Sequence, residues 1–234
     1  MFVIGVFILV ILLALVFSIP VAFFVIIGSG SAADIISALT TPSMVLTLLV
    51  IQDLILILTP YFIYFRNKAL TWVELGLSSM SLKDAVNRVG LGLVAGIGYA
   101  AVILAVTKLI NYSGTGSVPG GQLNNLTDYI LLIIGGSIVA PISEEFFFRG
   151  VAFGGVKKWL ENRGFKDSFV LSLAFSSIFF AAVHGYDIFG TTVVLIAGII
   201  FAFLYYKTGS LLSPMIAHAF YNGVLITTDY MHFK

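Results

Sequence analysis

Seven apolar runs, separated by polar stretches, constrain the fold of this sequence more than any other feature. They cover residues 2–27, 44–65, 89–110, 129–156, 168–183, 191–206 and 211–226. Several of these runs reach the roughly 20 residues that a helix needs to cross a bilayer. Hydrophobic residues make up 59% of the 234 residues and charged residues only 10%, whereas soluble domains carry about 25% charged residues. The sequence therefore predicts an all-α polytopic transmembrane helix bundle with about seven spans.

The positive charges between the runs predict the orientation of the bundle. The run 2–27 has no basic start, so we expect a retained transmembrane helix rather than a cleaved signal peptide. If the N-terminus is cytoplasmic, the inner side holds nine of the twelve Lys and Arg residues: Arg66, Lys68, Lys83, Arg88, Lys157, Lys158, Arg163, Lys166 and Lys207. This distribution follows the positive-inside rule. We expect a multi-pass protein of the cell membrane that is surrounded by membrane lipid.

The lack of cysteine narrows the possible chemistry. With no cysteine in the sequence, disulfides, thiolate metal sites and thiol nucleophiles are excluded. The formal net charge of +1 gives no indication of a charged partner, and we expect no nucleic-acid partner.

Three charged residues lie inside the apolar run 129–156, namely Glu144, Glu145 and Arg149. A charge near the middle of a bilayer costs roughly 2.5–3.5 kcal/mol on insertion scales, so such residues face a protein interior or a watery cavity. Residues four apart share a helix face, which pairs Glu145 with Arg149. Glu144 points about 100° away. We therefore predict that Arg149 neutralises Glu145 while Glu144 faces a polar intramembrane cavity.

Further polar residues occur in other apolar runs. His184 ends the fifth run, and His218 and Asn222 share one face of the last run. Each of them alone is explained by an interhelical hydrogen bond, and Glu145 with Arg149 by a structural ion pair. Asp53 is either a buried contact between helices or part of the functional cavity. Together, a carboxylate, two imidazoles and a carboxamide on three runs favour a catalytic site.

This set of side chains is suited to the hydrolysis of an amide. A buried carboxylate can take a proton from water, and an imidazole can share that water. A His and an Asn on one helix face can donate hydrogen bonds to an oxyanion. Two His and one Glu also form a known catalytic zinc set, so Glu144, His184 and His218 are an alternative metal site. The HExxH spacing of common zinc proteases is absent.

Three short motifs carry a resemblance to a known family. In order along the chain, EEFFFRG resembles EExxxR, FAAVH resembles FxxxH and HAFYN resembles HxxxN. These are the motifs of the CAAX-protease and bacteriocin-processing family of intramembrane endopeptidases, which includes the type II CAAX prenyl endopeptidases. The trio in this order on three apolar runs is highly specific, although each motif alone is weak.

The resemblance implies an endopeptidase in which Glu144 and His184 activate water. His218 and Asn222 would form the oxyanion hole, and Glu145, Arg149 and Phe180 would support the site. The resemblance favours a glutamate mechanism without a cofactor and leaves zinc as the alternative. The substrate would be a membrane-associated peptide or a prenylated protein. The catalytic helical core would cover residues 128–230, and residues 1–127 would form scaffold and cavity wall.

The motif residues lie at different depths in straight helices. With a rise of about 1.5 Å per residue, Glu144 lies roughly 20 Å from the inner end of its run, and His218 roughly 10 Å. We expect tilted or broken helices, with a bend at Pro141 and a last helix that begins, already buried, near Pro214. The catalytic hypothesis requires Glu144 to lie within a water-bridged distance of His184 or His218.

The third long run is rich in glycine, with Gly90, Gly92, Gly96 and Gly98. Small residues at this spacing allow transmembrane helices to approach closely.

Two further functions remain open from the sequence. One is a proton-coupled transporter, in which the buried carboxylates and histidines form a relay. The other is a non-catalytic membrane immunity or regulatory protein that keeps the motifs for stability.

Overall fold

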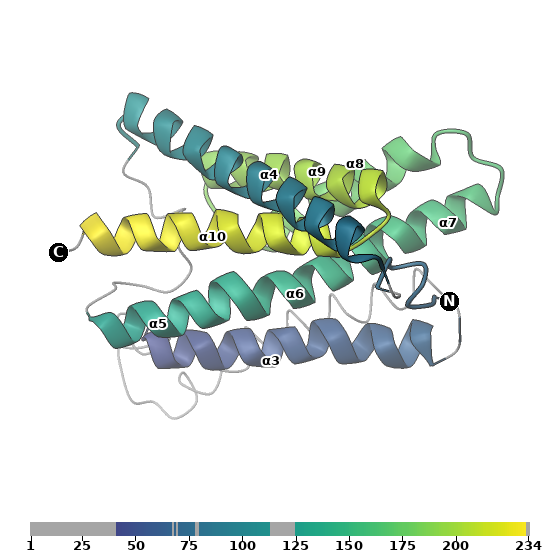
Figure 1. Ribbon diagram of the computed structural model, residues 1–234, viewed down its shortest axis with the longest axis horizontal. Coiled ribbons are helices and arrows are strands. Elements are labelled where there is room, and N and C mark those ends of the chain that lie inside the picture. Colours follow the sequence, from purple (N-terminus) through teal and green to yellow (C-terminus); the bar gives the residue numbers. More distant parts are fainter. Residues whose placement is uncertain (1–40, 67, 69, 78–79, 113–124, 233–234) are drawn as a thin grey trace, which may run out of the picture.

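A computed structural model describes residues 41–66, 68, 70–77, 80–112 and 125–232. The expected first span, residues 2–27, lies outside the described residues. Within these ranges the chain folds into helices and contains no β-strand (Figure 1). The predicted all-α fold class is confirmed.

The helices follow one another in the order that the apolar runs predict. Three segments, labelled η, are π-helical, and two of these lie on either side of the short helix α6. The elements are α3 (Pro42–Pro60), η1 (Tyr61–Phe65), α4 (Leu82–Leu109), α5 (Leu126–Ile134), η2 (Gly135–Val139), α6 (Ala140–Glu145), η3 (Phe146–Gly155), α7 (Val156–Glu161), α8 (Ser168–Ala182), α9 (Ile188–Thr208) and α10 (Leu212–His232).

Four helices of the described part are long and apolar enough to cross a membrane, namely Leu46–Phe65, Leu82–Leu109, Leu126–Glu161 and Ile188–Thr208. The chain is therefore a multi-pass integral membrane protein. The run 168–183 forms the 15-residue helix α8, which at about 1.5 Å per residue is shorter than a bilayer core of roughly 30 Å. The run 211–226 forms α10. The total of seven spans stays a prediction.

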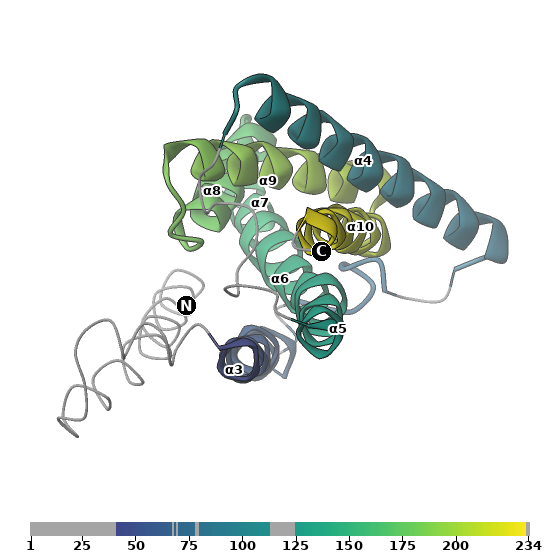
Figure 2. The same cartoon turned by 90° about the vertical axis from the view of Figure 1, so that its left-hand side faces the viewer.

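The helix α10 lies in the middle of the bundle. It packs against α4 and α9 on one side and against α5, η2 and α6 on the other (Figure 2). The close approach of α4 to α10 depends on two glycines of α4. A Cβ atom at Gly96 would lie 2.2 Å from the Ala217 carbonyl oxygen, and a Cβ atom at Gly92 would lie 2.6 Å from the Ser213 carbonyl oxygen. The glycine prediction is confirmed at these two positions, whereas Gly90 and Gly98 face open space.

The basic residues that the sequence assigns to the inner side lie at one end of the helices. The end of α10 at this side is tied to the segment before α4, because the Leu211 N–H donates to the Leu75 carbonyl and the Ser213 hydroxyl to the Arg88 carbonyl. Lys158 on α7 pairs with Glu74 of the same segment at 2.5 Å. Lys108 lies at the opposite end of α4. The charge asymmetry is thus present in the fold, and the cytoplasmic N-terminus stays a prediction.

The change of helix register near the motif occurs in η2, just before Pro141. Pro141 lies in the first turn of α6, where a proline needs no N–H. The regular α-helix is thus interrupted by η2 directly before the helix that contains Pro141, and the bend that we predicted at Pro141 stays a prediction. The last helix begins at Leu212, two residues before Pro214, and Leu211 and Ser213 are fully buried there. The prediction of a buried start near Pro214 is confirmed.

Candidate functional site

Glu145 and Arg149 form a buried ion pair at the end of α6. Arg149 Nε lies 3.0 Å from Glu145 Oε2, and both side chains are completely buried. The guanidinium also lies 4.2 Å from the centre of the Phe180 ring and 5.3 Å from that of Phe201. A buried charge needs such a partner, because an unpaired one is strongly destabilising. The ion pair confirms the prediction made from the spacing of four residues between Glu145 and Arg149.

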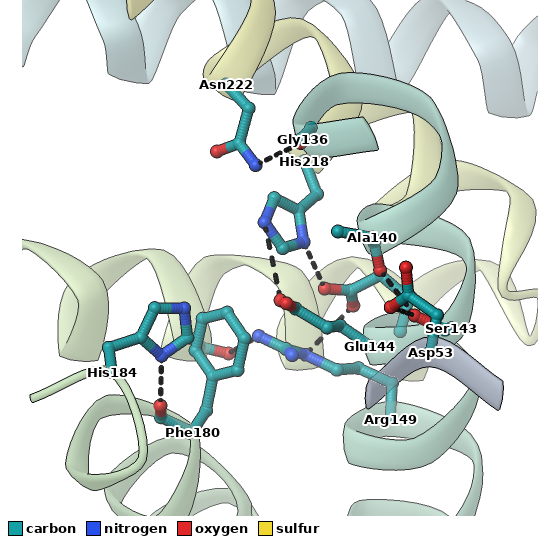
Figure 3. A network of polar contacts seen from close by, with 12 residues as sticks. Asp53, Gly136, Ala140, Ser143, Glu144, Arg149, Phe180, His184, His218 and Asn222 are labelled. Carbon is teal, nitrogen blue, oxygen red and sulfur yellow. Dashed lines mark hydrogen bonds and ion pairs between the residues drawn. The ribbon is translucent and has the colours of Figure 1, made fainter. Parts of the chain in front are cut away.

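His218 connects the two glutamates. Its Nδ1 lies 2.8 Å from Glu145 Oε1, and its Nε2 lies 3.8 Å from Glu144 Oε2 (Figure 3). Glu145 also forms the ion pair with Arg149, and the oxygens of a carboxylate only accept hydrogen bonds, so Nδ1 of His218 carries the proton and donates. The Nε2 atom of the neutral ring is then an acceptor that faces Glu144. This distance meets the requirement that Glu144 lie near an imidazole.

His184 lies at the end of α8 and is held by Phe180. Its Nδ1 is 2.6 Å from the Phe180 carbonyl oxygen, which can only accept a hydrogen bond, so this nitrogen also carries the proton. The Phe180 ring packs edge-on against both imidazoles. The distance between ring centres is 4.6 Å to His184 and 5.7 Å to His218. His184 and Glu144 do not come within the 4.0 Å of an ion pair. The imidazole that lies within ion-pair distance of Glu144 is therefore that of His218, and the joint activation of water by Glu144 and His184 stays a prediction.

Asn222 lies one turn beyond His218 on α10, as their spacing predicts. Its side-chain Nδ2 donates to the main-chain carbonyl of Gly136 in η2 at 2.8 Å (Figure 3). One of its two N–H groups is therefore used by the protein itself. The role of Asn222 in an oxyanion hole stays a prediction.

Asp53 of α3 joins the site through Ser143. Asp53 is 3% exposed, and its carboxylate accepts a hydrogen bond from the Ser143 hydroxyl, which also contacts the Ala140 carbonyl at 2.9 Å. Ser143 directly precedes Glu144. The sequence signal for this contact is the lone Asp in an apolar run, which left two interpretations open. The interpretation as a buried contact between helices is confirmed by this hydrogen bond, and the membership of Asp53 in a functional cavity stays a prediction.

A metal site is not assembled by these side chains. Among the residues that the structure describes, no three His, Asp or Glu side chains are grouped to hold an ion. The alternative zinc ligands, Glu144, His184 and His218, thus do not form a set of three. A hollow of about 460 Å³ lies elsewhere, near Gly150, Lys158 and Tyr205, and no predicted site residue lines it. The water-filled cavity beside Glu144 stays a prediction.

Comparison with known proteins identifies this part of the chain. The family described as "Type II CAAX prenyl endopeptidase Rce1-like" matches residues 126–224, which include all three motifs. This region is similar to the Rce1-like family over its whole matched length. The resemblance drawn from the motifs is therefore confirmed, and it extends from α5 into α10.

Two curated relatives are similar to the chain. "Putative membrane peptidase YdiL" of Bacillus subtilis (strain 168) is 34% identical over 96 residues, which is 41% of this chain and 36% of YdiL. "Membrane-embedded CAAX protease MroQ" of Staphylococcus aureus (strain USA300) is 32% identical over 90 residues, which is 38% of this chain and 36% of MroQ. The matched part thus spans about a third of each relative. No solved structure matches the chain.

Proposed function

We propose that this protein is an intramembrane endopeptidase that hydrolyses a peptide bond of a membrane-associated substrate. The observation that carries the proposal is the position of Glu144 Oε2, 3.8 Å from the acceptor nitrogen Nε2 of His218. This pair lies in the region that matches the Rce1-like family. The printed names of both relatives, a membrane peptidase and a CAAX protease, support the same reaction class.

Glu144 is the proposed general base. A water molecule between Glu144 and His218 would donate one hydrogen bond to each of them, which orients its oxygen for attack. Glu144 takes one proton, the hydroxide adds to the substrate carbonyl carbon, and the protonated Glu144 then returns that proton to the amine as the C–N bond breaks. General base catalysis of this kind contributes about 10²–10⁴-fold in rate.

Glu145 would control the proton on His218. Because Nδ1 of His218 donates to Glu145 at 2.8 Å, the neutral ring offers only an acceptor at Nε2. In the proposed water activation, His218 keeps its single proton on Nδ1 and orients the water through Nε2, so it does not also donate to the oxyanion. The predicted role of His218 as an oxyanion donor would require a ring that is doubly protonated before water attacks, paired with the Glu145 carboxylate, and Glu144 alone would then orient the water. His184 and the second N–H of Asn222 would complete the site.

The test is cleavage of a reporter peptide by the purified chain in detergent or proteoliposomes. Glu144→Gln should lower kcat by about 10²–10⁴-fold. Glu161→Gln is the matched control, because Glu161 is an exposed glutamate at the end of the same helical stretch. His218→Ala should also lose activity, whereas His232→Ala, at the exposed end of α10, should not. Full activity of folded Glu144→Gln would refute the proposal and favour a non-catalytic membrane protein.

The same assay tests the substrate class and the metal alternative. Prenylated and unmodified peptides of one sequence are compared, and the family match leads us to propose that the prenylated peptide is cleaved faster. Activity that survives exhaustive chelation, with metal content checked by elemental analysis, would rule out the zinc alternative. Uptake of a proton-coupled solute without peptide cleavage would instead favour a transporter.

A further inference from the structure

The carbonyl of Gly136 lacks a main-chain donor, and the sequence explains why. In an α-helix this oxygen would accept from the N–H of Ala140, and in a π-helix from that of residue 141. The Ala140 N–H donates instead to the Gly135 carbonyl, and residue 141 is a proline, which has no N–H. Neither helical donor is therefore available. Asn222 of α10 supplies the missing hydrogen bond at 2.8 Å.

This hydrogen bond lies at the turn that orients the glutamates. Along an uninterrupted α-helix, the 16 residues from Tyr129 to Glu145 rotate the chain so that the two side chains point about 160° apart. One extra residue in a π-helical turn lowers this angle to about 60°. Both residues do face α10, since Tyr129 contacts Thr227 at 3.0 Å and Glu145 contacts His218 at 2.8 Å. The turn in η2 thus allows both contacts.

We propose that Pro141 and Asn222 act as a pair that fixes this turn and so positions Glu144 and Glu145 against His218. Pro141 disfavours an uninterrupted α-helix, because its ring clashes with the carbonyl four residues before it. Asn222 then binds the carbonyl that the proline leaves without a donor. Asn222 is thus a positioning residue that acts through Gly136, a role separate from any hydrogen bond to a substrate oxyanion. The effect on catalysis rests on the proposed peptidase function, whereas the effect on stability does not.

A cycle of variants tests the pairing. Asn222→Ala removes the donor, and Pro141→Ala provides a main-chain N–H that can reach the Gly136 carbonyl. In the natural background, Asn222→Ala should lower the thermal unfolding midpoint by about 2–8 °C, as expected for an unsatisfied, partly buried carbonyl in a chain of this size. In the Pro141→Ala background, Asn222→Ala should lower the thermal unfolding midpoint by less than half of this amount. Asn222→Leu, which keeps the volume, serves as a second donor-free variant.

Thr228→Ala is the matched control on the same helix. The Thr228 hydroxyl bonds only to the Val224 carbonyl of its own helix, at 2.8 Å, so its effect should be equal in both backgrounds. The proposal that Pro141 and Asn222 act as a pair is overturned if Asn222→Ala lowers the thermal unfolding midpoint equally in the natural background and in the Pro141→Ala background. Tryptophan fluorescence follows the unfolding and needs no activity, so this result stands even if no peptide is cleaved.

Peptidase activity separates positioning from direct catalysis. If Asn222 acts through Gly136, the double variant Pro141→Ala/Asn222→Ala should have a kcat about tenfold or more above that of Asn222→Ala alone. Small misplacements of reacting groups cost on the order of 100-fold in rate, so restoring the turn should recover part of this loss. A main-chain N–H at residue 141 cannot replace a donor to the oxyanion. An equal loss of kcat in both backgrounds would therefore overturn the positioning role and assign Asn222 to the substrate.

Discussion

Glu145 holds two side chains at once, because one oxygen contacts Arg149 at 3.0 Å and the other contacts His218 at 2.8 Å. All three residues are buried. Arg149 gains further stabilisation from the faces of Phe180 and Phe201, since aromatic rings attract cations. Glu145 therefore supports the site from behind, while Glu144 faces the acceptor nitrogen of His218.

We expect Arg149→Met to destabilise the protein by about 3–5 kcal/mol, because it leaves Glu145 charged and buried. The double variant Glu145→Gln/Arg149→Met should be markedly more stable than Arg149→Met alone, since no uncompensated charge remains. The measurement is the free energy of unfolding in a mild detergent. Lys157→Ala, in the partly exposed pair with Glu161, should cost at most about 1 kcal/mol. Equal losses for Arg149→Met and Lys157→Ala would contradict this account.

The contacts that the sequence predicted are those between residues close in the chain. The spacing of four pairs Glu145 with Arg149 and places His218 and Asn222 on one face, and both hold. The contacts of Glu145 with His218 and of Asn222 with Gly136 could not be predicted. They join helices far apart in the sequence, and they depend on π-helical turns, which have no pattern in a short sequence window.

The helices α4 and α10 are held close by glycines on one face of α4. Gly96→Ala should destabilise the protein by about 1–3 kcal/mol or more, because its Cβ would lie 2.2 Å from a main-chain oxygen that cannot move aside. Gly98→Ala is the matched control, since it faces open space and gains up to about 1 kcal/mol from helix propensity. Thermal midpoints of the two variants should move in opposite directions, and the same shift for both would disprove the close approach.

The apolar runs also predicted the helices and their order, but not how each run is divided. The run 129–156 is one helical stretch in which α-helical and π-helical turns alternate. Proline at 141 indicates a departure from the regular helix without specifying its form. The neighbouring helices decide the form, since α10 supplies both His218 and Asn222 to this stretch.

At the scale of the whole molecule, the basic residues gather at the end where α7 and the start of α10 meet the segment before α4. The absence of cysteine allows the orientation to be measured with single-cysteine variants. Lys166→Cys lies between α7 and α8 at the basic end, and Leu109→Cys lies at the opposite end of α4; both positions are exposed.

The positive-inside rule predicts that the basic end is cytoplasmic. A membrane-impermeant thiol reagent added to intact cells should therefore label Leu109→Cys and spare Lys166→Cys until the membrane is opened. The reverse pattern would place the basic end outside, and the predicted orientation would be wrong. Because α4 begins at the basic end and finishes at the other, labelling at both positions in intact cells would contradict its assignment as a membrane span.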